Sequence, residues 1–303
     1  MGYHLTDSDR EKAVSLFVGQ KKKLCEIAGE LGFSYVAIRM ALKKKGVYEL
    51  RDSSALHRKY KLNEHAFDTI TDESAYWVGF LMADGYVLHS GGVANSVGLC
   101  LHERDREHVS LFRSFVGSTH PIRVKKINKK TKGGRSCSVY FRSKKMAHAL
   151  GKYGVVPNKS LTATVSDSLA QNRHFWRGVI DGDGAVTIDA CGMPNLSVVG
   201  SHTLMRQFVT FITGRITYTP YIEPSKRSKV LYVRTCGEGA KQIATLLYDD
   251  CSVSLMRKRK TTEMFKNTKE YRIFSPEARI NMKAAAKKVW AKRKAAASLL
   301  TPS

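Results

Sequence analysis

Apolar positions near the start of the chain recur every three or four residues, the spacing of an amphipathic helix. This pattern predicts a helix over 24–31 (LCEIAGEL) and a second helix over 34–44. Gly32 lies between them, where a tight turn can use its freedom to adopt a positive φ. With an earlier helix over 9–17, residues 1–47 are predicted to form a small all-α unit of the helix-turn-helix type.

The second helix of this unit carries Tyr35, Arg39 and Lys43. In a helix-turn-helix the second helix enters the major groove, so these side chains are predicted DNA contacts. The same pattern also fits an ordinary helical hairpin with a solvated basic face. The next residues, 48–69, are polar and charged and are predicted to form a linker.

The middle of the chain contains an internal repeat. Segment 77–87 (WVGFLMADGYV) is similar to segment 176–186 (WRGVIDGDGAV), at an offset of 176 − 77 = 99 residues. Downstream of each segment, strand and helix patterns alternate in the order αββαββα. The prediction is therefore an α+β fold of two pseudo-symmetric halves, 70–160 and 161–270, paired like the subunits of a symmetric dimer.

Charge indicates what such a protein binds. The 303 residues contain 51 Lys and Arg against 26 Asp and Glu, a formal net charge of +25, and 43% of the residues are hydrophobic. A folded protein this basic most often binds a polyanion. Nucleic acid is the leading candidate, and an acidic membrane surface is the rival.

Several classes of protein are disfavoured. No apolar run approaches the roughly 20 residues that span a bilayer. The six cysteines include no C-x-x-C pair, which argues against a zinc ribbon or a dithiol redox site. The first residues show no signal-peptide pattern, so a cytoplasmic protein is expected.

The segment 271–303 is rich in Ala, Lys and Arg and has few large apolar residues. It is a strong helix former by propensity but buries little, so we expect it to fold along a phosphate backbone. Lys287, Lys288 and Arg293 are the predicted contacts. A solvated, frayed tail is the alternative.

Small residues recur at every fourth position along both copies of the repeat. They are Ala75, Gly79 and Ala83 in the first copy, and Gly178 and Gly182 in the second. On a helix this spacing makes a flat strip, and two such strips can pack with their backbones in close contact. We therefore expect the two helices to lie side by side.

Each of these helices ends in an aspartate followed by glycine, at Asp84 and Asp183. A carboxylate is unfavourable at a helix C-terminus, and two converging carboxylates repel each other. A divalent cation removes both problems, and Mg²⁺ prefers oxygen ligands. The doubled motif therefore predicts a metal site suited to phosphodiester cleavage, although a lone Asp-Gly usually marks only a turn.

Segments 77–85 (WVGFLMADG) and 176–184 (WRGVIDGDG) resemble the two signature helices of a single-chain LAGLIDADG homing endonuclease. The resemblance extends over about 70–268 and includes the PNKS motif at 157–160 and the LMRKRK motif at 255–260. It implies a saddle of two halves whose sheets lie in the major groove. It also implies site-specific, metal-dependent cutting of both strands of double-stranded DNA.

The same resemblance implies a set of site residues. Asp84 and Asp183 would be the catalytic metal ligands, and the backbone carbonyls of Ala83 and Gly182 would add ligands. Mg²⁺ is the implied cofactor, with Mn²⁺ as a substitute. Because both halves lie in one chain, we expect a monomer.

The family usually places a basic residue near the metal-bound water, at a strand-to-helix junction. Lys144 fits this position in the first half. The matching stretch of the second half, 235–240, contains no Lys or Arg. This departure indicates either unequal cutting of the two strands or a basic residue supplied from elsewhere, such as Lys229 or Arg234.

Polar residues that orient water often close the second strand of each half in the family. His102 and Ser201 are the nearest matches here. The first acid of the signature is Met82 in one copy and Asp181 in the other. Since that acid is not normally the essential ligand, Asp181 is interpreted as structural.

Alternate residues of the predicted strands are expected to face DNA. A shift of one residue in phase would exchange the two faces. The candidates in the first half are Ser96, Arg123, Lys125, Arg135, Ser138 and Arg142, and those in the second half are Asn195, Ser197, Arg227, Lys229, Tyr232 and Arg234.

The tail resembles the nuclease-associated modular DNA-binding segments of phage and bacterial homing nucleases, and the N-terminal unit would be a second appendage. Two alternatives share the scaffold: an intron RNA splicing factor and a non-cleaving DNA-binding regulator. The two retained aspartates argue against the regulator. The appendages favour duplex DNA over RNA.

Overall fold

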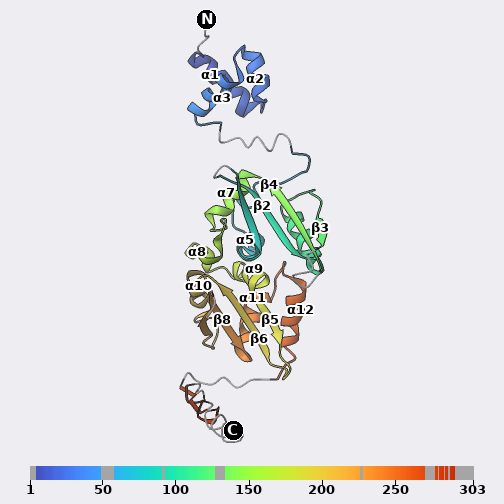
Figure 1. The fold of residues 1–303 in the computed structure, drawn as a ribbon, viewed down its shortest axis with the longest axis vertical. Helices are drawn as coiled ribbons and strands as arrows, with labels where there is room; N and C mark the ends of the chain where they lie inside the picture. Colours follow the sequence, from blue (N-terminus) through green and yellow to red (C-terminus); the bar gives the residue numbers. More distant parts are fainter. Residues whose placement is uncertain are drawn as a thin grey trace, which may run out of the picture.

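The computed structural model describes residues 5–48, 58–90, 93–126, 134–225, 228–269 and 277–290, without 279, 283 and 286. Helices and strands alternate along most of this chain, as Figure 1 shows. In the described ranges, no helix is both long enough and apolar enough to cross a membrane.

The N-terminal residues form three helices around a hydrophobic core of their own. The elements are α1 (Asp7–Val14), which continues as a π-helical turn η1 (Ser15–Gly19), then α2 (Leu24–Leu31) and α3 (Tyr35–Lys44). Gly32 ends α2 with a φ of 70°, and the Ser34 side chain caps α3 by accepting a hydrogen bond from the Ala37 amide. The predicted order of helix, tight turn and helix is present.

Part of the predicted linker packs against the first half. Phe67 is completely buried in the main core, and the backbone amide of Asn63 donates to the carbonyl oxygen of Val116. Leu62 and Ala66 pack against the same core, so this part of the segment contacts the first half although most of its residues are polar. Residues 49–57 lie outside the described residues.

The α+β architecture of two similar halves is confirmed. Each half runs αββαββα and holds a four-stranded antiparallel sheet, in the order β1-β2-β4-β3 in one and β5-β6-β8-β7 in the other. The first half comprises α5 (Asp72–Ala83), β1 (Gly85–Ser90), β2 (Val93–His102), α6 (Arg106–Phe115), β3 (Arg123–Lys126), β4 (Arg135–Arg142) and α7 (Lys144–Lys152). The second comprises α9 (Arg173–Asp183), β5 (Ala185–Ile188), β6 (Pro194–Gly200), α10 (His202–Ile212), β7 (Tyr221–Pro224), β8 (Leu231–Cys236) and α11 (Glu238–Tyr248).

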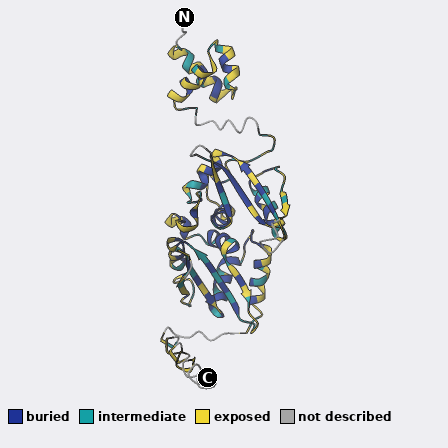
Figure 2. Cartoon of the chain, in the orientation of Figure 1, coloured by how far each residue is buried: buried dark blue, intermediate teal, exposed yellow. Residues whose placement is uncertain are grey.

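Shorter elements complete these halves. A 3-10 turn η2 (Glu103–Asp105) precedes α6, while η4 (Lys159–Leu161) and α8 (Asp167–Ala170) join the halves, and α12 (Met256–Phe265) follows α11. One continuous core spans both halves and includes Trp77 and Trp176, both fully buried. Figure 2 shows buried residues concentrated along α5 and α9, at the centre of the two halves.

The described residues between 277 and 290 are helical, as the composition predicts. Lys287 and Lys288 are exposed on this helix. Arg293, and Arg227 in the second half, lie outside the described residues.

Candidate functional site

Helices α5 and α9 pack with their backbones in direct contact. A Cβ atom built on Gly79 would collide with the carbonyl oxygen of Phe175, and one built on Gly178 would collide with that of Tyr76. A glycine inside a helix costs about 1 kcal/mol relative to alanine, and this contact is the structural reason for it. The predicted strips of small residues therefore do form the junction between the halves.

Asp84 and Asp183 meet at one end of this junction. Asp84 is the C-cap of α5, and Asp183 is the last residue of α9. A Cβ atom built on Gly182 would collide with the Ala83 side chain and would lie 3.5 Å from the Asp84 amide nitrogen. The two helix ends are thus adjacent, and both aspartates remain exposed to solvent.

The surroundings of these carboxylates disfavour their charged forms. The pKa of Asp183 is raised to about 6, first because the protein around it displaces water and second because the Asp84 carboxylate repels it. Displaced water also raises the pKa of Asp84, although the nearby cations Lys258 and Arg257 oppose this effect. Additional positive charge would therefore stabilise the ionised pair.

Two lysines supply part of that charge from corresponding places in the halves. Lys159 and Lys258 are separated by the repeat offset, 258 − 159 = 99. The Lys159 ammonium donates to the carbonyl oxygen of Gly85 at 2.6 Å, and the Lys258 ammonium donates to that of Gly184 at 2.6 Å. Each glycine directly follows one of the paired aspartates. Both lysines are buried.

Lys258 makes more contacts than Lys159. Its ammonium also donates to the carbonyl oxygens of Ile180 and Asp181, both at 2.7 Å, and of Gly182 at 3.3 Å. These oxygens end α9, where the helix dipole favours a cation. Burial lowers the pKa of Lys258 to about 8, against the opposing attraction of the Asp181 carboxylate.

Asp181 lies inside the protein and not at the open site. It is completely buried and accepts hydrogen bonds from Tyr76 Oη at 2.8 Å, Tyr248 Oη at 2.6 Å and the Leu255 amide at 2.6 Å. Burial raises the pKa of Asp181, and these hydrogen bonds lower it. Because Tyr76 belongs to α5, the carboxylate connects the two halves, which agrees with a structural role.

Lys144 lies away from the paired aspartates along the first sheet. It follows Arg142, which pairs with Ser96 in β2, whereas Gly85, directly after the first paired aspartate, pairs with Leu99. Three residues of strand span roughly 10 Å. Lys144 is also not among the charged groups with the largest effects on the pKa of either aspartate. The proposed role of Lys144 stays a sequence-based prediction.

His102 and Ser201 both act as helix caps. His102 Nδ1 accepts from the Arg104 amide at 3.2 Å and is exposed. Ser201 is buried, and its hydroxyl accepts from the Leu204 amide at 3.1 Å and donates to the carbonyl oxygen of Ala163. The single proton of Ser201 is therefore used within the protein, whereas His102 Nε2 faces the opposite side of its ring from the capping bond.

Strand register places most of the predicted DNA contacts of the first half on one face. Arg123 pairs with Ser138 and Lys125 with Ser136, so these basic residues lie on the same side of the sheet as Arg142. The side chains that alternate with them on β4, Cys137, Val139 and Phe141, are buried in the core.

Arg135 is the exception. By strand alternation it falls on the same side of β4 as the buried residues, at the end of the strand. Its Nε lies 3.2 Å from Glu103 Oε2. Arg135 therefore lies on the opposite side of the strand from Arg142, because residues an odd number of positions apart on a regular strand point to opposite sides. Its contact with DNA stays a prediction.

The second sheet shows the same alternation. Asn195, Ser197, Tyr232 and Arg234 alternate with the buried residues of β6 and β8, and the Arg234 guanidinium lies 5.0 Å from the centre of the Tyr232 ring. Lys229 is exposed in the connection between β7 and β8.

The three predicted contacts of the N-terminal unit are exposed on α3. Arg39 and Lys43 lie over the Tyr48 ring, with their charged groups 5.7 and 5.9 Å from its centre. Tyr35 occupies the first turn of the helix. Arg39 and Lys43 therefore give this side of α3 a positive charge.

The donor atoms at the helix ends suit a hard divalent cation. Two carboxylates and the carbonyl oxygens of Ala83 and Gly182 are all oxygen ligands, which Mg²⁺ prefers together with water. Within the described ranges no group of three or more His, Cys, Asp or Glu side chains is placed to hold a metal.

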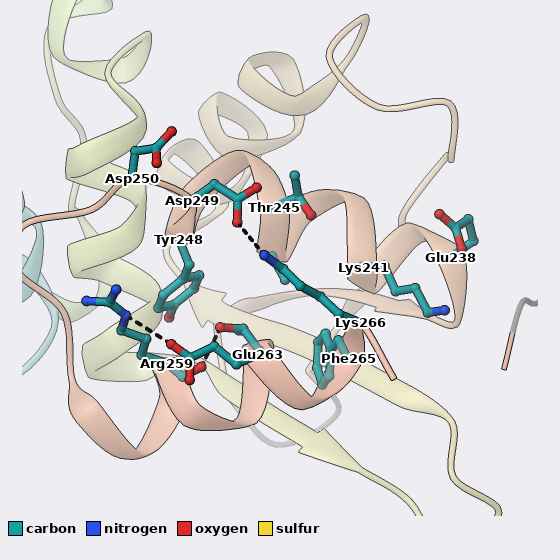
Figure 3. A pocket seen from close by; sticks show the side chains of 12 residues that line it. Glu238, Lys241, Thr245, Tyr248, Asp249, Asp250, Arg259, Glu263, Phe265 and Lys266 are labelled. Atoms are coloured by element: carbon teal, nitrogen blue, oxygen red, sulfur yellow. Dashed lines mark hydrogen bonds and ion pairs between the residues drawn. The ribbon is translucent and has the colours of Figure 1, made fainter. Parts of the chain in front are cut away.

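A concave region lies between α11 and α12, away from the paired aspartates. This pocket of about 450 Å³ is lined mainly by polar and charged side chains. Several of these pair with each other, Arg259 with Glu263 and Lys266 with Asp249, as Figure 3 shows. Because these pairs satisfy one another, the pocket gives no indication of a ligand.

No family model and no curated protein matches the chain. Solved structures of homing endonucleases are similar to it, with low sequence identities and low TM-scores. The meganuclease I-SmaMI bound to uncleavable DNA has 12% identity, a TM-score of 0.43, and coverage of 64% of this chain and 90% of that one. The homing endonuclease I-WcaI bound to its DNA recognition sequence has 13% identity, a TM-score of 0.44, and coverage of 68% and 91%.

A third similar structure is the LAGLIDADG homing endonuclease I-GzeII in complex with its DNA target. It has 10% identity, a TM-score of 0.41, and coverage of 66% of this chain and 92% of that one. Likenesses this weak assign neither a reaction nor a residue to this chain.

Proposed function

We propose that this chain is a site-specific DNA endonuclease of the LAGLIDADG homing type, which cuts both strands of a long duplex site. The main support for this proposal is that Asp84 and Asp183 lie at the ends of two helices whose backbones are in contact. Each aspartate also lies near a buried lysine, and the two lysines occupy equivalent positions in the repeat. Two equivalent acid–lysine sites side by side suit two equivalent phosphodiester bonds.

In this proposal each residue has a distinct role. Asp84 and Asp183 hold the divalent cation, Mg²⁺ or Mn²⁺, with the carbonyl oxygens of Ala83 and Gly182 as further donors. When bound, the cation supplies an activated water and stabilises the leaving oxygen. Lys159 and Lys258 keep the helix ends positive enough for two carboxylates and a phosphate to approach each other.

The rest of the chain supplies binding. Basic residues on the exposed sheet faces, including Arg123, Arg142 and Arg234, would contact DNA in the two half-sites. The N-terminal unit and the basic tail, with Lys287 and Lys288, would lengthen the contact through phosphates. The net charge of +25 supports this assignment.

A randomised duplex library tests the proposal. The purified full-length chain is incubated with the library in Mg²⁺, and in Ca²⁺ as a binding-only control. Recovered ends that share a long motif would support the endonuclease. Specific binding without cutting in Mg²⁺ or Mn²⁺ would favour the regulator, and selective binding of RNA over duplex DNA would favour the splicing factor.

A further inference from the structure

Helix α3 exposes large apolar side chains on its outer face. Tyr35 is 51% exposed, Val36 is 64% exposed and Met40 is 60% exposed. At 100° per residue Val36, Arg39 and Met40 share one side of the helix, and Tyr35 lies at its margin in the first turn. Ile38, Ala41 and Leu42, which hold α3 in the unit, are buried on the other side.

These exposed apolar residues are unfavourable for the stability of α3. Valine is a weak helix former because its branched side chain loses rotamer freedom, and an exposed position returns no burial in compensation. In the same N-terminal unit, α1 instead carries charged residues, including Asp7, Asp9 and Glu11. Apolar side chains gathered on one exposed helix face indicate a contact surface.

The charges around this face indicate the partner. Arg39 lies between the apolar residues, and Lys43 and Lys44 follow in the last turn. A partner must therefore be polyanionic and still offer apolar groups to a helix about 10 Å wide. The major groove of DNA meets both conditions, because it is lined by phosphates and its only apolar group is the thymine C5-methyl.

We propose that Val36 and Met40 read thymine methyl groups, so that the N-terminal unit selects an A·T-rich segment at the edge of the recognised site. Tyr35 lies at the margin of this face, and Arg39, Lys43 and Lys44 hold the helix against the phosphates. This inference rests on the proposed binding of duplex DNA but does not depend on cleavage.

The test uses the full-length chain and the duplex sites that it selects in Ca²⁺. Short blocks of each site are remade with deoxyuridine in place of thymidine, which removes only the methyl groups. Deoxyuridine in one of these blocks should weaken binding by about three- to fourfold for each methyl group in contact, which is the change in affinity expected from burying one methyl group. The Val36→Ala, Met40→Ala double variant should bind the thymidine site more weakly and should not respond to uracil in that block.

Val18→Ala is the matched control, since Val18 is 51% exposed on η1 of the same unit and lies outside α3. It should keep the full response to uracil. The inference is overturned if no block separates wild type from the double variant, or if no duplex site is selected at all. If sites are selected and respond as expected but are never cut, the endonuclease proposal fails and this inference stands.

Discussion

Lys159 and Lys258 hold equivalent places in the two halves, each donating at 2.6 Å to the carbonyl oxygen of the glycine after a paired aspartate. Their spacing from those aspartates is also equal, 159 − 84 = 75 and 258 − 183 = 75 residues. The junction therefore has a pseudo-symmetric set of four charged side chains, with two acids on the packed helices and two lysines beneath the helix ends.

Loss of the Lys258 ammonium should cost both stability and activity. Lys258→Met leaves the carbonyl oxygens at the end of α9 without their donor, and each unsatisfied buried group costs roughly 1–3 kcal/mol. Thermal unfolding followed by circular dichroism should show a midpoint lower by about 5–10 °C. Lys260→Met, at an exposed position on the same helix, should unfold like wild type, and equal midpoints for the two variants would contradict this role.

The packing of α5 on α9 predicts severe damage from one added methyl group. Gly79→Ala would force a Cβ atom into the carbonyl oxygen of Phe175, so we expect a loss of at least about 3 kcal/mol in the free energy of unfolding. Gly151→Ala, in α7, meets no atom within 4 Å and should gain about 0.5–1 kcal/mol through helix propensity. Urea denaturation of both variants checks this contrast. A mild effect of Gly79→Ala would mean that the helices do not touch.

Asp181 and Asp183 should respond oppositely to neutral replacement. Asp181→Asn places an amide against two tyrosine hydroxyls and the Leu255 amide, and breaking this buried network should cost about 3 kcal/mol of stability. Asp183→Asn removes a carboxylate whose charged form is disfavoured by displaced water and by repulsion from Asp84, so the metal-free protein should be as stable as wild type or more stable. Urea midpoints in chelator distinguish these outcomes, and equal losses would contradict the division of roles.

The raised pKa of Asp183 predicts a pH dependence. Its folded value of about 6 exceeds the ordinary 3.8, so between these values the folded chain binds more protons than the unfolded chain. The contribution of Asp183 to the stability of the metal-free protein therefore decreases as pH rises from about 4 to about 6. Because cations bind the ionised form, the rise in melting temperature caused by Mg²⁺ should grow as pH increases through about 6.

Comparison with Asp183→Asn isolates this effect from the other titrating groups. The difference in melting temperature between the variant and wild type, without metal, should increase over the same pH interval. A difference that stays constant from pH 4 to pH 7 would contradict the raised pKa.

Periodicity and the repeat were sufficient to predict the architecture. Small residues at every fourth position in α5 and α9 predicted the backbone contact. Strand alternation predicted that Ser138, Arg142 and Arg234 lie on the side of their strands that faces away from the core. These features depend on local spacing, which sequence displays directly. The side of β4 on which Arg135 lies could not be predicted, because one residue of phase decides the face of a strand, and its salt bridge with Glu103 is visible only in three dimensions.

The lysines of the site were not predicted, although the motifs containing them were noted. Lys159 and Lys258 come to the helix ends through contacts between segments 75 residues apart, and no local periodicity encodes such contacts. The equal offset of 99 residues was the available signal. The partners of Asp181, above all Tyr248, were hidden for the same reason.

The proposed function depends above all on the paired aspartates, and one comparison tests their role most directly. Asp84→Asn and Asp183→Asn are each assayed on a selected duplex site, with strand cutting measured in Mg²⁺ and affinity measured in Ca²⁺. We predict that each variant binds the site within a fewfold of wild type and makes no double-strand break. Undiminished double-strand cutting by either variant would contradict the assignment of these two carboxylates.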